Sequence, residues 1–119
     1  MTDITKIAKA QYSAKLAEEL LSFEVPQWQD DDGKPITIYF RPTMRLSQRS
    51  VMLKHYSKDE FDKALACRLV FQARDKDGKA LFKLNQLDQI VDEFDPSVVQ
   101  YICNKFEEAE PSQDDIAKN

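Results

Sequence analysis

Ile36-Thr37-Ile38-Tyr39-Phe40-Arg41 is the segment whose pattern says most about the architecture of this chain. Ile36, Ile38 and Phe40 fall on one side of an extended backbone, and residues 37, 39 and 41 fall on the other. Such an alternation with a period of two is typical of a half-buried β-strand. The segment therefore predicts a strand with one apolar face.

A second extended segment before this strand completes a hairpin. Phe23, Val25 and Trp28 are bulky residues that favour strands, and the turn Asp30-Asp31-Asp32-Gly33-Lys34-Pro35 separates them from Ile36. Because Pro26 has no N–H to donate, we expect its strand to lie at a sheet edge or to carry a bulge. We therefore predict one β-hairpin near residues 23–41.

The rest of the chain has helical periodicity. Apolar residues recur every three or four positions from Ile4 to Leu21, and a second helix is expected from about Ser47 to Tyr56. Ser57 and Glu60 have the spacing of a capping box, with Tyr56 and Phe61 at the positions of a hydrophobic staple. We expect the helix that starts there to run to Ala73 and to be the most buried.

Two more helices are predicted towards the C-terminus. Residues 75–79 form a tight turn in which Gly78 supplies a positive φ, a short extended piece follows, and Asn85 is expected to cap a helix. Asp95-Pro96 has the cap-and-proline pattern of a helix start. The stripe that follows it is apolar with helical spacing: Val99, Ile102, Cys103 and Phe106.

These elements predict an α+β fold that is mostly helical, with about five helices and the one hairpin. Residues 1–108 are expected to form a single domain, and residues 109–119 a flexible acidic tail. The length of 119 residues suits one domain with one modest core. We expect Cys67 and Cys103 to be buried thiols, because two cysteines at this spacing do not form the disulfide framework of a secreted protein. A disulfide between them is the alternative that the sequence leaves open.

The sequence offers little for catalysis, and we expect the chain not to be an enzyme. His55 is its one histidine, no Cys-x-x-Cys occurs, and the two glycines, Gly33 and Gly78, cannot form a phosphate-binding loop. The Asp-x-Asp-Gly turns are in the wrong register for calcium, since a loop with Gly78 sixth would end on Leu84. We therefore assign no catalytic, cofactor-binding or metal-binding residue.

Binding is the more fitting role, and the charge distribution suggests where. The net charge is −4, but residues 1–58 carry nine basic and seven acidic residues, whereas residues 59–119 carry eight and fourteen. Basic residues without an acidic one run from Arg41 to Lys58. A nucleic-acid-binding regulator using this stretch is the alternative, but the isoelectric point of about 5.0 argues against it. An acidic protein partner or self-association fits better.

The candidate partner-binding residues follow from these patterns. Arg45 and Arg49 lie four residues apart and are expected on one helix face. Trp28 either packs on the hairpin or lies at an interface, where tryptophan is favoured. The full set is Trp28, Tyr39, Arg41, Arg45 and Arg49.

The order of features resembles the tail assembly chaperones of long-tailed, lambda-like bacteriophages. Three patches carry the resemblance, and together they span roughly residues 20–108. They are Val25-Pro26-Gln27-Trp28 with its turn and the strand to Arg41, then the helix pair that leads into Val70-Phe71-Gln72-Ala73-Arg74-Asp75, and then Asp77-Gly78-Lys79-Ala80-Leu81-Phe82 with the helices from Leu87 to Phe106.

The resemblance implies a protein without enzymatic activity. No cofactor is expected, and because no stretch approaches the apolar length of a membrane span, no membrane association is expected. It would act in the host cell cytoplasm, hold the tape measure protein soluble while tail tube subunits gather, and be absent from the finished virion. It could form homo-oligomers. Relatives also occur in a longer form made by ribosomal frameshifting, and in this sequence the two forms would diverge near residues 110–119.

Overall fold

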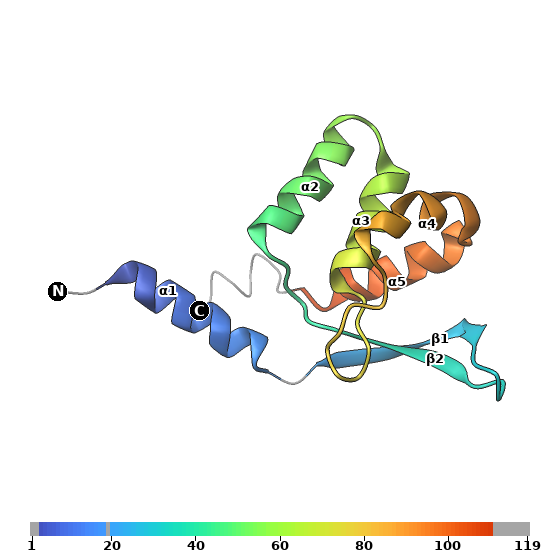
Figure 1. Ribbon diagram of the computed structural model, residues 1–119, viewed down its shortest axis with the longest axis horizontal. Helices are drawn as coiled ribbons and strands as arrows, with labels where there is room; N and C mark the ends of the chain where they lie inside the picture. The colour runs from blue at the N-terminus through green and yellow to red at the C-terminus, as the bar shows by residue number, and fades with distance from the viewer. Residues whose placement is uncertain (1–2, 19, 111–119) are drawn as a thin grey trace.

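The computed structural model describes residues 3–18 and 20–110. A helical body packs on a two-stranded antiparallel sheet, and the N-terminal helix extends away from that body (Figure 1). The described residues confirm the mostly helical α+β fold. Its elements are α1 (Ile4–Leu16), β1 (Leu21–Gln29), β2 (Pro35–Phe40), α2 (Leu46–Ser57), α3 (Phe61–Gln72), the 3-10 helix η1 (Leu84–Gln86), α4 (Leu87–Glu93) and α5 (Pro96–Glu108).

The hairpin has the irregularity that Pro26 predicts. β1 and β2 pair in register from Leu21 opposite Phe40 to Val25 opposite Ile36, after which the register shifts. The chain between Val25 and Gln29 is therefore bulged, and a proline is tolerated there because no regular ladder bond needs its missing donor.

The first helix is shorter than the sequence predicts. α1 ends at Leu16, and Leu21, expected to be its last residue, instead begins β1. The Arg41 side chain donates from Nε to the Leu16 carbonyl at 2.9 Å and satisfies one of the carbonyls left unpaired at the helix end. Pairing with β2 thus overrides the helical pattern, because the strand gains ladder hydrogen bonds that a longer helix would forgo.

The core lies where α3 and α5 pack on the hairpin and on each other (Figure 1). Phe23, Phe40 and Phe106 bring three rings together at its centre, with centroids 5.0, 5.6 and 5.8 Å apart. α3 has more buried residues than any other described helix, as its wide apolar coverage predicts. The apolar stripe of α5 is buried in full: Val99, Ile102, Cys103 and Phe106.

The predicted capping box at Ser57 is wrong. Ser57 is the last residue of α2 and donates from its hydroxyl to the Lys54 carbonyl at 2.8 Å, so it cannot also start α3. Asp59 turns the chain with a φ of 60°, and Glu60 takes the N-cap position without a side-chain cap bond. The rings of Tyr56 and Phe61 are nevertheless in contact, with centroids 5.9 Å apart.

The two later helix starts have different outcomes. Asn85 does not cap α4, because it lies inside η1 and Gln86 takes the N-cap position. Asp95 caps α5 as predicted, accepting a hydrogen bond from the Ser97 amide at 2.9 Å, and Pro96 follows it. The prediction holds at Asp95 because an aspartate N-cap and a proline at the next position both favour a helix start. It fails at Asn85 because the 3-10 helix η1 includes that residue and moves the start of α4 to a later position.

Two polar side chains lie on the buried face of α3, where the sequence predicts apolar packing. Arg68 donates from Nε to Gln72 at 2.9 Å and forms an ion pair with Glu110, and Gln72 donates to the Arg41 carbonyl at 3.1 Å. Buried polar groups are tolerated when each has a partner. Glu110 belongs to the predicted tail but contacts the body, while residues 111–119 lie outside the described residues.

Candidate partner-binding site

The turn at residues 75–79 positions Arg74 beside β2, and the turn at residues 30–34 has the same form. Residues 30–34 and 75–79 share the pattern Asp-x-Asp-Gly-Lys and the same hydrogen bonds. In the second turn the Asp75 carboxylate accepts from the amides of Asp77 and Lys79 at 2.9 and 3.0 Å, and Gly78 has a φ of 84°. Glycine permits that φ without strain. The turn sends the chain back along itself beside β2.

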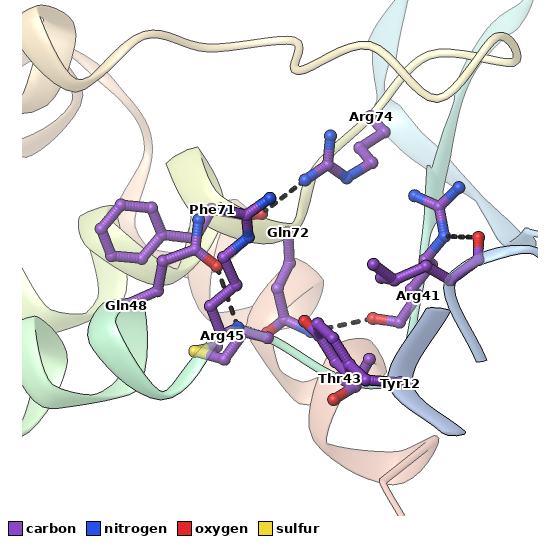
Figure 2. Close-up of a pocket in the computed structure, with 10 residues that line it drawn as sticks. Tyr12, Arg41, Thr43, Arg45, Gln48, Phe71, Gln72 and Arg74 are labelled. Carbon is purple, nitrogen blue, oxygen red and sulfur yellow. Dashed lines mark hydrogen bonds between the residues drawn. The ribbon is translucent and has the colours of Figure 1, made fainter. Parts of the chain in front are cut away.

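Arg74 lies immediately before this turn and extends the sheet by one residue. Its backbone pairs with that of Tyr39 in both directions, at 2.8 and 3.0 Å, and also bridges Ala80. Its guanidinium donates to the carbonyl of Gly78 at 2.9 Å and to that of Phe71 at 3.5 Å (Figure 2). The side chain is therefore held in place by the main chain around it.

Arg41 and Arg45 approach the same place from the segment between β2 and α2. Arg41 is positioned by the Nε bond to Leu16 and by the bond that its own carbonyl accepts from Gln72. Arg45 stands at the N-cap of α2, where its amide donates to the Gln48 side chain at 3.2 Å. Two of the three arginines are thus tied to neighbouring elements through named bonds, and Arg45 stays the most exposed.

These three arginines line one pocket of about 240 Å³ (Figure 2). Its remaining walls are polar and apolar side chains from α1, α2, α3 and the segment before α2: Tyr12, Leu16, Thr43, Met44, Gln48, Phe71 and Gln72. The pocket therefore joins α1 to the body of the protein. It combines a basic wall with apolar surface.

Burial and the positive charges that line the pocket lower the pKa of one of its arginines, Arg74. Burial lowers the pKa of Arg74 below its ordinary value, and the positive charges of Arg41 and Arg45 lower this pKa further, while Tyr12 has the opposite effect. The ion pairs within residues 3–18 and 20–110 include none of these three arginines. A bound anion would relieve this repulsion.

The basic stretch is divided by the fold. Arg41 and Arg45 line the pocket, whereas Arg49 lies at a separate hollow beside Met52 and Leu53, 3.9 Å from the Glu110 carboxylate. Arg45 is the N-cap residue of α2 and its carbonyl accepts from the Arg49 amide at 3.0 Å, so the two residues are one turn apart, yet their side chains line different hollows. Tyr39 reaches the site through its main chain, which pairs with Arg74.

Sequence reasoning missed Arg74 as a site residue. It follows the end of α3 and precedes a turn, so neither helical nor strand periodicity points to it. The bridge to Tyr39 and Ala80, which joins segments far apart in the sequence, is what brings it beside Arg41.

Trp28 belongs to a different surface. Its ring packs edge-on against Phe82 and Phe94, with centroids 6.4 and 5.6 Å away, and it stays half-buried at the edge of the core. The indole therefore packs on the body, and it also lines a shallow hollow with Gln27 and Glu93, while a role at an interface stays a prediction. This end of the hairpin lies across the molecule from α1 (Figure 1).

Other reactive groups are engaged in structural contacts. His55 lies in the last turn of α2 with Nδ1 3.3 Å from the Glu60 carboxylate. Cys67 and Cys103 are buried and unbridged, so the disulfide left open by the sequence does not form; burial raises the pKa of Cys67, and that of Cys103 to about 12. Within the described part of the chain, no group of three His, Cys, Asp or Glu residues could hold a metal ion.

None of the helices formed by residues 3–18 and 20–110 is both long and apolar enough to cross a bilayer.

The architecture is that of a small, mostly helical α+β domain with one hairpin and a projecting N-terminal helix. A solved structure that shares it is that of the bacteriophage HK97 tail assembly chaperone, with a TM-score of 0.56 and 12% sequence identity over 84% of this chain and 93% of that chain. The resemblance seen in the sequence is thus confirmed at the level of the fold. No protein-family model matches the sequence, and neither does any curated protein.

Proposed function

We propose that this chain is a phage tail assembly chaperone that binds the tape measure protein and keeps it soluble until tail tube subunits gather. One observation carries the proposal: nearly the whole chain shares its fold with nearly the whole of a tail assembly chaperone. The ordered motifs between residues 20 and 108 support it independently, because that resemblance rests on the residue pattern alone.

The exposed apolar surface supports a holding function. Leu46 and Leu53 of α2 are 84% and 58% exposed, and Ile4 of α1 is 77% exposed. Exposed apolar groups on helices are suited to binding apolar segments of another protein. A long tape measure protein has such segments before assembly, and several copies of a small chaperone can cover them.

The proposal has further parts. The chaperone acts in the host cytoplasm by binding rather than by catalysis, and it does not enter the virion. A longer frameshifted form diverges near residue 110. A tape measure reading frame downstream of the gene, with a slippery sequence near that codon, is the genomic arrangement expected.

Co-expression in a bacterial host tests the proposal. A tape measure fragment from the same genome should shift from the insoluble to the soluble fraction when this chain is present, and it should co-purify with the chain. A fragment that stays insoluble and fails to co-purify would exclude the proposed partner.

Two variants test whether the exposed surface of α2 contacts the tape measure fragment. Leu53→Ser removes an exposed apolar group from α2 and should reduce co-purification, whereas Lys54→Ser, on the next residue of the same helix, should not. Equal recovery with both variants would place the contact away from α2 while leaving the proposed partner intact.

A further inference from the structure

The arginine pocket holds more positive charge than the described fold uses. The guanidinium group of Arg45 has no hydrogen-bond partner within residues 3–18 and 20–110, and Arg41 uses only its Nε for Leu16. Bringing such groups together is costly unless an anion compensates.

Arg68 shows how the same chain neutralises a guanidinium for structural purposes. It lies on the buried face of α3 with Gln72 and the Glu110 carboxylate both bonded to it. At the pocket the described residues supply main-chain carbonyls to Arg41 and Arg74, but no carboxylate to Arg41, Arg45 or Arg74. The difference points to a ligand from outside the described residues.

We propose that the pocket binds a glutamate or aspartate side chain on an acidic, partly apolar segment of a protein partner. Guanidinium groups present paired N–H donors that match the two oxygens of a carboxylate. Leu16, Met44 and Phe71 supply apolar wall for the carbon stem and for its apolar neighbours. The proposal rests on the proposed function only for the identity of the partner, and it adds the chemistry by which that partner is recognised.

A protein carboxylate fits the observations better than a nucleic-acid backbone. The three arginines converge on one concave pocket, while Arg49 lies apart beside Glu110, so no continuous basic track follows the stretch from Arg41 to Lys58. The chain also has a net charge of −4, which repels a polyanion at long range. A single carboxylate flanked by apolar residues meets little of that repulsion.

The test uses the full chain and a fluorescent helical peptide of alternating glutamate and leucine turns, with anisotropy as the readout. The peptide should bind, and its glutamine counterpart should not. Arg45→Gln should weaken binding about tenfold, the effect of losing a charged hydrogen bond. Arg45→Lys should bind the peptide with intermediate affinity, because the lysine ammonium keeps the charge but lacks the paired N–H donors of the guanidinium.

Lys34→Gln is the matched control, because Lys34 is an exposed base in the hairpin turn across the molecule from α1. It should bind the peptide as the wild type does. Arg74→Gln tests a second arginine of the pocket in the same assay. Because the Arg74 guanidinium donates to two carbonyls, circular dichroism is needed to establish that this variant is folded.

Equal binding of the acidic peptide by wild type and Arg45→Gln would overturn the proposal. So would equal binding of the glutamine peptide, or tighter binding of an oligothymidine that is lost in the same variants. Its failure can be told apart from failure of the proposed function. If a tape measure fragment co-purifies equally with wild type and Arg45→Gln, the chaperone role stands and the pocket assignment falls. If the acidic peptide binds while the fragment does not, the reverse holds.

Discussion

α1 and α5 are both thirteen residues long and both begin at a capping aspartate, yet α5 has five buried residues and α1 has none. The Asp3 carboxylate accepts from the Lys6 amide at 3.2 Å, and the Asp95 carboxylate accepts from the Ser97 amide at 2.9 Å. Equivalent local signals therefore start both helices. What differs is whether an apolar stripe meets a partner within the chain.

This difference separates two roles for a helix. α5 contributes to stability through packing, which is the main source of helix stability in proteins. α1 presents Ile4 and Ile7 outwards and touches the body near its C-terminal end, where Tyr12 and Leu16 line the arginine pocket. A radius of gyration of 15.9 Å reflects this projection, since a compact domain of this length has about 13.5 Å.

The largest expected effect comes from truncating one apolar side chain in each helix. Phe106→Ala should lower the free energy of unfolding by about 3–5 kcal/mol, because Phe106 is fully buried against Phe23 and Phe40. Ile7→Ala should change it by less than about 0.5 kcal/mol, since Ile7 is 56% exposed. Urea denaturation measures both, and a large loss for Ile7→Ala would show that α1 is packed in the free protein.

A smaller effect is expected from two arginines that approach the same carboxylate. Arg68→Ala should lower the free energy of unfolding by about 2 kcal/mol, because Arg68 is buried and its loss removes both the hydrogen bond to the Gln72 side-chain oxygen and the close ion pair with Glu110. Arg49→Ala should cost less than about 1 kcal/mol, since its pair with Glu110 is exposed and 3.9 Å long. Similar losses for both would contradict the structural role of Arg68.

The two caps should separate global from local stability. Asp95→Ala should lower the melting temperature, whereas Asp3→Ala should reduce helical circular dichroism with little change in melting, because α1 is not part of the core. Hydrogen bonds from Ser97 hold the pKa of Asp95 below its ordinary value of 3.8. Its contribution is therefore complete above that pH and is lost as the pH falls towards the lower folded pKa.

That pH dependence has its own check. The difference in stability between wild type and Asp95→Ala should be constant near neutral pH and should shrink below pH 3.8. A difference that grows on acidification would show that the carboxylate is not held by the helix start.

Thiol labelling should reveal the same division without altering stability. Cys67 and Cys103 should not react with a thiol reagent at pH 8 in the folded protein, because both are buried and the pKa of Cys103 is raised to about 12. A cysteine introduced by Ile7→Cys should react at once. Mass spectrometry counts the labels, and rapid labelling of Cys103 would indicate that α5 opens readily.

Much of the fold could be predicted because its signals are local. The alternation from Ile36 to Phe40 follows from strand geometry, and the Asp95-Pro96 start follows from the unpaired amides of a first helical turn. Pro26 predicted the bulge for the same reason, since a missing donor is a property of one residue. The predictions failed where two local signals competed, as at Ser57, which ended one helix instead of starting the next.

The candidate site was predicted only in part. Arg41 and Arg45 were predicted from their charge. Arg74 joins them in the pocket because its backbone, just after α3, pairs with that of Tyr39. Arg49 was grouped with them because of its spacing, but its side chain lies at a different hollow beside Glu110.

Residue order alone thus specified the hairpin, the glycine turns, the start of α5 and its apolar stripe, because each depends on neighbours within one or two turns of chain. The end of α1, the burial of Arg68 and the meeting of three arginines arose from packing, because each requires groups that are distant in the chain to come within bonding distance. Backbone pairing between Tyr39 and Arg74 helps to hold these like charges together despite their repulsion.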